Sequence, residues 1–196
     1  MRKVILAATM VAVAFMLGRL TAQDIRPTCN MCPSTYVTNE EIQEYLKVPS
    51  VDQQIRSVDI GKTRVQVAVS YRGKLDKPAP NSVAEHSQVT EVYHVISGSA
   101  TNVTGPDLID SVARARTNAA VAGLNGPGHN ASGIRNGVTQ QLKAGDVLVI
   151  PAGTGHQFTK IDDHISYIMI RVDPDKVVPL MDEAASKAYL AKRPTR

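Results

Sequence analysis

The chain has 196 residues, 43% of them apolar, which suffices for one domain with a hydrophobic core but not for two of ordinary size. Its formal net charge is +4. Three of the positive charges, Arg2, Lys3 and Arg19, lie in the first 22 residues, where there is no acid, so +4 less 3 leaves +1 for the rest. A nearly neutral domain lacks the basic surface that nucleic acid requires, and nucleic-acid binding is therefore not expected.

The first 22 residues have the pattern of an export signal. A basic start is followed by an apolar run over residues 4–17, and the small residue Ala22 precedes Gln23. We expect residues 1–22 to be a signal peptide, removed after Ala22, which leaves a secreted or periplasmic protein with no stable insertion in a membrane. An uncleaved anchor is the alternative, but the apolar run is shorter than the roughly 18 to 20 residues of a spanning helix.

Residues 23–50 are expected to form an N-terminal extension, which carries the only two cysteines, Cys29 and Cys32. In an exported protein a local disulfide between them is the first expectation. Free thiols or an unrecognised metal site are the alternatives. Covalent haem would need a histidine at the position of Pro33.

One short helix is predicted on each side of the central region. Thr38 and Glu41 form a capping box ahead of a helical segment that Pro49 closes. The last segment, residues 176–196, is predicted to hold a helix from about residue 179 to residue 192. Its apolar residues at helical spacing are expected to face the core: Leu180, Ala184 and Ala188.

The central region, residues 51–175, alternates in hydrophobicity with a period of two, as half-buried strands do. Five runs show this pattern, at residues 63–71, 91–103, 138–142, 146–150 and 165–172. Glycines punctuate the runs, and Gly98 is expected to lie in a turn. Many short strands with such punctuation predict an antiparallel barrel or sandwich rather than a parallel sheet with crossover helices.

Residues 106–136 interrupt this pattern with a stretch rich in glycine, asparagine, alanine and serine. A structureless loop of this length in a compact domain is typically a functional lid or disordered, and we expect a lid that moves when the pocket is empty. A helix over residues 107–122 is the alternative. The spacing of Gly126, Gly128 and Ala131 nominally fits a dinucleotide motif, but no strand precedes it, so dinucleotide binding is not supported.

The chemistry is concentrated in two motifs. Residues 145–156, with the sequence GDVLVIPAGTGH, keep the spacing G-x5-P-x-G-x2-H without a departure. Pro151 and Gly153 favour a tight turn after an apolar strand, and the returning chain then directs His156 toward the interior. This pattern resembles the second motif of the cupin superfamily, although Lys160 stands where that motif closes with asparagine.

The first cupin motif is present but incomplete. Residues 91–98, EVYHVISG, look like its glutamate strand and glycine turn, and His86 fits its second histidine, whereas Ala84 occupies the place of the first. The resemblance covers residues 54–173. It implies a mainly β fold, a single double-stranded β-helix barrel of jelly-roll type, to which the short N-terminal helix and the C-terminal helix are added.

The resemblance also implies a metal site. Three of the four ligands that cupins usually have carry over, namely His86, Glu91 and His156. Two histidines and one carboxylate leave coordination positions open and suit one divalent ion, whether iron, manganese, nickel or zinc. The fourth ligand is then water or a neighbour such as Glu85 or Gln88, unless the protein has become a metal-free binding module.

Tyr93 is the candidate catalytic residue, because alternation along a strand puts it on the same face as Glu91. The cupin-type lyases that cleave dimethylsulfoniopropionate are similar in placing a tyrosine two residues after the ligand glutamate. A packing role for this aromatic ring is the alternative. His94 should point to the opposite face, which argues against it as a fourth ligand, and His129 and His164 are given no role.

Two classes of function remain open. In the first, the metal polarises or activates a small polar substrate, as in a metal-dependent lyase, isomerase or dioxygenase. In the second, the same pocket holds a small ligand without turnover. A homodimer is expected from the resemblance alone, because cupins often pair through their sheets.

Overall fold

The computed structural model describes residues 27–48 and 51–193. By its internal contacts the chain separates into residues 1–30 and residues 31–196, and the fold described below is that of the second unit. The expected signal peptide, residues 1–22, lies outside the described residues.

The disulfide predicted for the N-terminal extension is confirmed. Cys29 and Cys32 are both disulfide-bonded. Because the sequence has no other cysteine, no thiol is left free.

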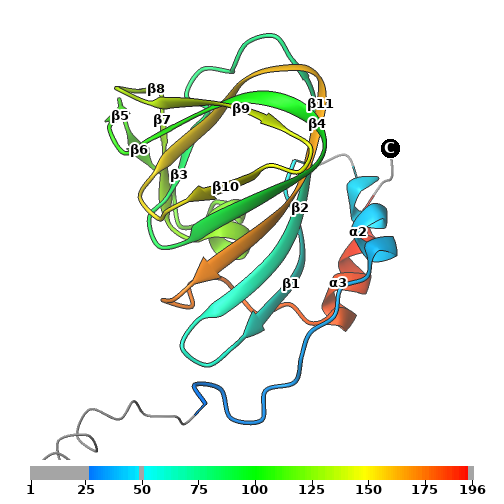
Figure 1. Ribbon diagram of the computed structural model, residues 1–196. Coiled ribbons are helices and arrows are strands. Elements are labelled where there is room, and N and C mark those ends of the chain that lie inside the picture. The colour runs from blue at the N-terminus through cyan, green and yellow to red at the C-terminus, as the bar shows by residue number, and fades with distance from the viewer. Residues whose placement is uncertain (1–26, 49–50, 194–196) are drawn as a thin grey trace, which may run out of the picture. The chain divides into compact units, whose positions relative to one another are not determined.

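Within the described residues, nine antiparallel strands form one folded sheet, the two layers of which lie on either side of the core, and two short strands form a separate sheet (Figure 1). The strands are β1 (Gln53–Asp59), β2 (Arg64–Leu75), β3 (Val83–His86), β4 (Thr90–Gly105), β5 (Leu108–Ile109), β6 (Val112–Ala113), β7 (Gly128–Ala131), β8 (Gly133–Ile134), β9 (Val138–Lys143), β10 (Val147–Ile150) and β11 (Gly155–Asp173). One layer of the large sheet has the order β1-β2-β11-β4-β10 and the other the order β6-β7-β3-β11-β4-β9, and β5 and β8 form the separate sheet. The predicted barrel thus takes the form of a double-stranded β-helix with two layers.

The strands β4 and β11 belong to both layers, and each bends where it passes from one to the other. The register between them shifts between Lys160 and Ile165, and Gly98 pairs with Ile165 at this corner. Gly98 has a φ of 74°, and a Cβ atom there would lie 1.9 Å from the carbonyl oxygen of His164. Gly98, which was expected to lie in a turn, bends the continuous strand that covers the predicted run at residues 91–103, because only glycine permits this close approach of two backbones.

The core lies between the two layers, and β11 shows how alternation fills it. Buried Tyr167 and Met169 alternate with half-buried Ile168 and Ile170. Residues of the same kind from the neighbouring strands complete this cluster: Ala68, Tyr93, Val95, Ala100, Leu142, Ile150, Phe158, Ile161 and Ile165. The next buried position on β11 is the charged Arg171, which marks where the apolar core gives way to a polar site.

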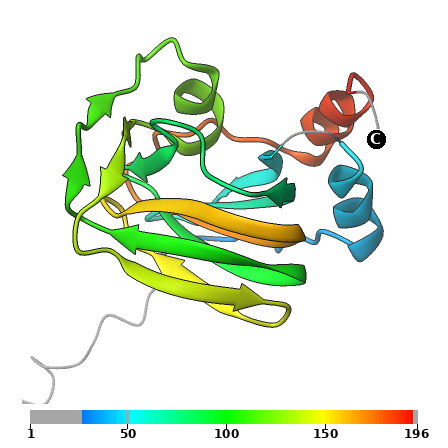
Figure 2. The same cartoon turned by 90° about the horizontal axis from the view of Figure 1, so that it is seen from above.

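Two short helices, α2 (Asn39–Leu46) and α3 (Glu183–Leu190), lie side by side against β1 and β2 (Figure 2). Thr38 caps α2 as predicted, because its hydroxyl accepts a hydrogen bond of 3.1 Å from the backbone N–H of Glu41. The rings of Tyr45 and Tyr189 stack with their centres 6.2 Å apart and join the two helices. Within the described part of the chain, no helix combines the length and apolar character needed to span a membrane.

The face that α3 buries differs from the prediction. Asp182 caps this helix through its side chain, so the helix begins several residues later than expected. Ser186 is buried and Tyr189 is half-buried as a result. The three residues that were expected to face the core are exposed: Leu180, Ala184 and Ala188.

The insert at residues 106–136 contains secondary structure, so the expectation of a structureless loop is wrong. β7 pairs with β3, and β6 pairs with β7, which extends the second layer. β5 pairs with β8. The alternative helix over residues 107–122 is also wrong, because β5 and β6 occupy its first part and only η1 (Val121–Asn125), a π-helix, follows. Movement of this segment as a lid stays a prediction.

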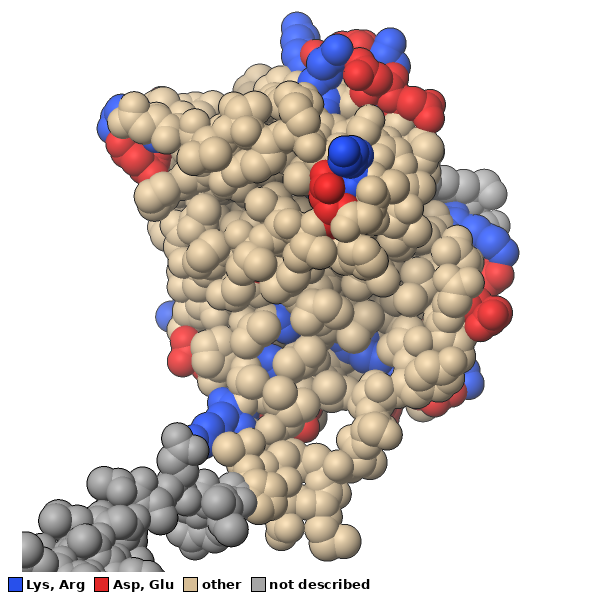
Figure 3. Space-filling view, in the orientation of Figure 1, with Lys and Arg blue, Asp and Glu red and all other residues tan. Residues whose placement is uncertain are grey.

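Many charged side chains lie at the margins of the face drawn in Figure 3, but a group of opposite charges lies within its upper half and basic side chains are visible within its lower half. Three large apolar side chains are exposed on the edge strands β9 and β10: Val138, Val147 and Val149. Single exposed apolar residues are normal on protein surfaces. The homodimer expected from the resemblance therefore stays a prediction.

Candidate metal centre

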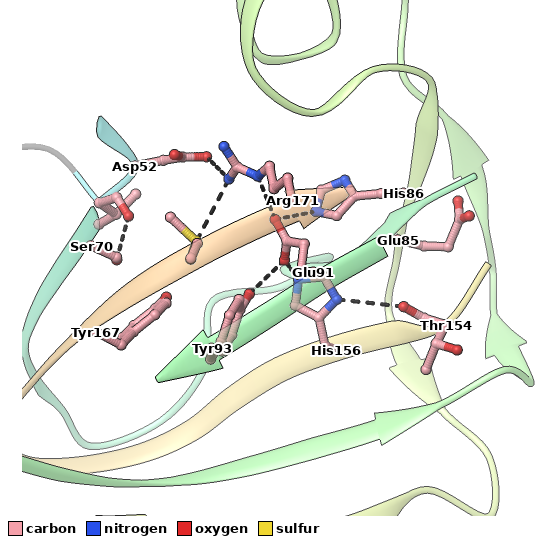
Figure 4. A network of polar contacts seen from close by, with 12 residues as sticks. Asp52, Ser70, Glu85, His86, Glu91, Tyr93, Thr154, His156, Tyr167 and Arg171 are labelled. Carbon is pink, nitrogen blue, oxygen red and sulfur yellow. Dashed lines mark hydrogen bonds and ion pairs between the residues drawn. The ribbon is translucent and has the colours of Figure 1, made fainter. Parts of the chain in front are cut away.

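Three buried side chains meet beside the core: His86, Glu91 and His156 (Figure 4). His86 ends β3, whereas Glu91 and His156 are each the second residue of a strand, β4 and β11. His156 pairs with Ala84 of β3, and Glu91 pairs with Ile150 at the end of β10, from which a short turn leads into β11, so the three strand ends lie together. One ligand atom from each side chain lies within 4.8 Å of the other two. The structure thus brings the three predicted ligands to one place.

The turn of the second motif is tied to the first motif. Gly153 has a φ of 82°, as its tight turn requires, and its N–H donates to the carbonyl oxygen of His86 at 2.8 Å. The N–H of Ala152 donates to the hydroxyl of Thr90 at 3.1 Å. The turn that precedes His156 is therefore fixed to residues at or beside the other two predicted ligands.

The distances between the three side chains fit a shared ion. Nε2 of His86 lies 3.5 Å from Oε1 of Glu91, and Nε2 of His156 lies 3.5 Å from Oε2. These separations are longer than ordinary hydrogen bonds. They match two ligands on one ion, since bonds of about 2.1 Å at tetrahedral angles hold ligand atoms about 3.4 Å apart.

Glu91 is ionised although it is fully buried. Nε of Arg171 donates to its Oε1 at 2.8 Å, and the hydroxyl of Tyr93 donates to its Oε2 at 2.7 Å. Burial alone raises the pKa of this carboxyl. The positive charge of Arg171 and its hydrogen bond outweigh that effect, so the pKa of Glu91 lies below its usual value.

Arg171 is the buried counter-charge. Its side chain is 1% exposed, and its Nη2 donates to Oδ2 of Asp52 at 2.6 Å. Burial lowers the pKa of a guanidinium, but the carboxylates of Asp52 and Glu91 raise that of Arg171 above its usual value. Its Nη1 atom is buried and has no hydrogen-bond partner among the described residues.

The two histidines are neutral but differ in which nitrogen carries the proton. Burial lowers the pKa of both rings, that of His86 to about 3. Nδ1 of His156 lies 3.4 Å from the carbonyl oxygen of Thr154, so Nδ1 carries the proton and Nε2 keeps its lone pair. Nδ1 of His86 instead lies 3.1 Å from Nη2 of Arg114, and since arginine can only donate, the proton of His86 sits on Nε2.

Ala84 holds the place of the missing fourth ligand, since it shares a face of β3 with His86 and lines the same cavity. Neither neighbour that the sequence suggested replaces it. Glu85 points away from the site, and its carboxylate accepts hydrogen bonds from the backbone N–H and the ring of His129. The amide of Gln88 is hydrogen-bonded at the surface. Neither Glu85 nor Gln88 is therefore placed to supply a fourth ligand.

The alternation predicted for β4 is confirmed, with Tyr93 buried on the face of Glu91 and His94 exposed. Burial, with the charge of Glu91, raises the pKa of Tyr93 well above its usual value. Its hydroxyl is therefore protonated, and its catalytic role stays a prediction. His129 and His164 pair with acids outside the three-residue cluster.

The cluster opens into a cavity of about 310 Å³. A second cavity of about 190 Å³ shares part of its wall, namely Arg72, Ala84 and His156. The small side chain of Ala84 therefore lies where the two spaces adjoin. Four residues of the insert line the larger cavity, as a lid would: Arg114, Ala120, Leu124 and Asn125.

Sequence reasoning missed the arginines of this site. Arg171 lies in the predicted strand at residues 165–172, two positions after Met169 on the buried face. That alternation predicts that Arg171 is buried. A buried charge needs a partner, so the sequence did contain a signal that Arg171 belongs to a polar site. Arg114 offered no such signal, because the insert has no periodicity that tells which of its residues turn inward.

Comparison with known proteins gives one family match, to the AraC-like ligand binding domain, over residues 135–194. No curated protein is similar enough to match the chain.

Several solved structures resemble the fold at low sequence identity. A protein of Bacillus halodurans is 15% identical, with a TM-score of 0.42, over 82% of this chain and 98% of its own. A Klebsiella pneumoniae protein with a double-stranded β-helix domain is 19% identical, with a TM-score of 0.41, over 76% of this chain and 99% of its own. An RmlC-like cupin family protein of Methanocaldococcus jannaschii is 12% identical, with a TM-score of 0.39, over 76% and 98%. The two motifs and the strand topology are those expected of a cupin fold, and the match to the AraC-like ligand binding domain agrees with it over residues 135–194.

Proposed function

We propose that the protein is an exported cupin that holds one divalent metal ion through His86, Glu91 and His156 and acts on a small polar molecule in the adjoining cavity. The observation that carries this proposal is the convergence of three buried ligand atoms within 4.8 Å of one another. A surface cluster of acids would be weak support, but these three side chains are all buried and come from three different strands.

The donor set fits an ion. Each oxygen of the Glu91 carboxylate accepts one hydrogen bond and keeps a lone pair. Nε2 of His156 is free, with Nδ1 turned to the Thr154 carbonyl as is usual for ligating histidines. Nε2 of His86 becomes free once Arg114 releases Nδ1 of that ring. Glu91 and His156 can thus bind an ion without rearrangement, whereas His86 can do so only after the side chain of Arg114 moves away from it.

A bound ion would supply Lewis acidity toward a substrate oxygen or, as iron, redox chemistry. The chain's own residues set the conditions around it. Arg171 and Tyr93 fix the orientation of the Glu91 carboxylate. Tyr93 also lines the cavity, and because its raised pKa keeps the hydroxyl protonated we assign it the role of a hydrogen-bond donor rather than a base at neutral pH.

The alternative is a binding protein that holds a small ligand in the same cavity without turnover. The contact of Arg114 with His86 favours this alternative, because it keeps one of the three nitrogens protonated while the guanidinium stays in place. The name of the matching family model, which refers to ligand binding, is consistent with either function.

Metal analysis of the natively purified protein tests the proposal. We expect close to one equivalent of iron, manganese, nickel or zinc per chain. Iron would favour an oxygenase, and zinc or nickel a lyase or isomerase. A protein that is purified without metal, and takes up none of the four ions on dialysis, would leave only the binding alternative.

A further inference from the structure

The wall of the larger cavity carries an excess of positive charge. Three guanidinium groups line it, those of Arg72, Arg114 and Arg171, against the two carboxylates of Asp52 and Glu91. The net charge of these side chains is therefore +1. A divalent ion at the candidate metal centre would raise it to +3. In a recess with low-dielectric walls such an excess attracts an anion, because field lines concentrate between those walls.

Only one of the three arginines is neutralised by acids. Arg171 forms ion pairs with both Asp52 and Glu91. Among the described residues, no carboxylate forms an ion pair with Arg72 or Arg114. Nε of Arg72 donates to the hydroxyl of Tyr167, and its guanidinium lies over an aromatic ring.

Arg114 has only neutral partners. Its Nη2 donates to the carbonyl oxygen of Glu85 at 2.6 Å and to Nδ1 of His86 at 3.1 Å. Its Nε is buried without a hydrogen-bond partner among the described residues. A guanidinium in this state has strong donors to offer to an incoming oxyanion.

Two further buried atoms of the cavity wall lack partners within the described chain. Nη1 of Arg171 is a donor on a side chain 1% exposed, and Oδ1 of Asn125 is an acceptor on a residue 6% exposed. Buried polar atoms without partners are uncommon in native proteins, and one that lines a cavity is available to water or to a ligand. An anion that also bears a hydrogen-bond donor would accept a hydrogen bond from Nη1 of Arg171 and donate one to Oδ1 of Asn125.

We propose that the cavity binds a small organic anion with a carboxylate or similar oxyanion group, and that Arg114 is the residue that recognises it. This inference rests on the proposed function, because the anion occupies the cavity beside the three metal-site residues. It assigns a specific role to the insert, which contributes Arg114 and Asn125 to the wall.

Because Arg114 contacts His86, it should strengthen the binding of an anion and weaken the binding of a divalent ion. An anion that draws the guanidinium away from His86 lets the ring proton move to Nδ1 and leaves Nε2 free for an ion. Loss of the guanidinium removes both this contact and a positive charge near the ion. The variant Arg114→Met should therefore bind anions more weakly and a divalent ion more tightly than the native protein.

Calorimetric titration tests this directly, with succinate and inorganic phosphate as anions and succinamide as the neutral analogue of succinate. Each probe is titrated into metal-free protein and into protein loaded with zinc. The variants are Arg114→Met and the matched control Arg116→Met, which removes the same charge from an exposed position two residues away. Zinc affinity is measured for both variants in the absence of anion.

We expect saturable binding of at least one anion, none of succinamide, and a loss of affinity of about tenfold or more in Arg114→Met but not in Arg116→Met. Succinate preference identifies a carboxylate, and phosphate preference a phosphate group. Equal binding of succinamide, no anion binding up to about 10 mM, or equal effects of the two variants would overturn the inference. Anion binding without zinc uptake would instead refute the metal centre alone, and zinc uptake without anion binding would refute only the anion site.

Discussion

Glu91 is held in place by a buried ion pair, and the energetics of that pair can be tested one residue at a time. Arg171 and Glu91 are each 1% exposed, so neither charge can be screened by water. Removal of one partner from a buried pair leaves the other charge without compensation. We expect Arg171→Met to lower the free energy of unfolding of the metal-free protein by about 3 to 5 kcal/mol, as measured by denaturant titration.

The double variant separates this electrostatic effect from lost packing. Replacement of Glu91 by glutamine in the Arg171→Met background removes the uncompensated charge, so part of the lost stability should return. If Arg171→Met and the double variant with Glu91→Gln are equally unstable, the loss comes from packing and the account of the pair is wrong.

The two site histidines predict how stability depends on pH. Their pKa values are lowered by burial in the folded state, whereas in the unfolded chain they lie near 6.5. Below that value the unfolded state binds protons that the folded state does not, so the free energy of unfolding must fall as pH falls. For His86, whose folded-state pKa is about 3, we expect a slope that approaches about 1.4 kcal/mol per pH unit as pH falls from 6.5 toward 5, and His156 changes the slope in the same direction.

Denaturation of the metal-free protein at a series of pH values measures this slope. His86→Gln should make it shallower, since one of the two buried rings is gone. His94→Gln removes an exposed ring and should leave the slope unchanged. A slope that His86→Gln does not alter would contradict the assignment of that ring as buried and neutral.

At the scale of residues, the sequence was sufficient for groups that belong to a motif with fixed spacing. His86, Glu91 and His156 could be named because a turn and an alternating strand place such residues on one face. Arg114 could not be named, because it reaches the site from an aperiodic insert. Its role depends on a tertiary pairing, that of β7 with β3, which brings the insert to the cavity.

At the scale of elements, the bend of β4 depends on a single glycine. A Cβ atom at Gly98 would lie 1.9 Å from a backbone oxygen, and φ there is 74°. Gly98→Ala should therefore destabilise the protein by about 2 to 5 kcal/mol, since both overlap and backbone strain oppose it. Thermal unfolding of the two-layer domain would report this loss.

Gly73→Ala is the matched control, on the strand β2. Nothing lies within 4 Å of a Cβ atom built there, and its φ is not in the left-handed region. The change should stay within about 0.5 kcal/mol of the native stability. If the two substitutions cost the same, the corner at Gly98 is not the tight approach described here.

The elements themselves were predictable to different degrees. The long alternating runs correspond to β2, β4, β9, β10 and β11, because each of these strands has one face on the core. The short strands of the insert were missed, since two to four residues cannot establish a period. The buried face of α3 was mispredicted because Asp182, rather than a residue near 179, starts the helix.

At the scale of the whole molecule, export is a prediction from the first 22 residues, which lie outside the described part of the chain. Expression of the full sequence in a host that secretes proteins should yield a mature chain that begins near Gln23, with Cys29 and Cys32 still disulfide-bonded. Intact mass measurement with and without reduction checks both points. Recovery of the uncleaved chain in the membrane fraction would favour the anchor instead.

The central claim is that His86, Glu91 and His156 share one metal ion, and the metal content of single alanine variants tests it most directly. His156→Ala removes a ligand whose Nε2 lies 3.5 Å from Glu91, whereas His94→Ala removes an exposed ring on the opposite face of β4. We expect elemental analysis to find about one ion per chain in the native protein and in His94→Ala, and almost none in His156→Ala, which should also lose the metal-dependent rise in Tm. Full metal content in His156→Ala would contradict the account.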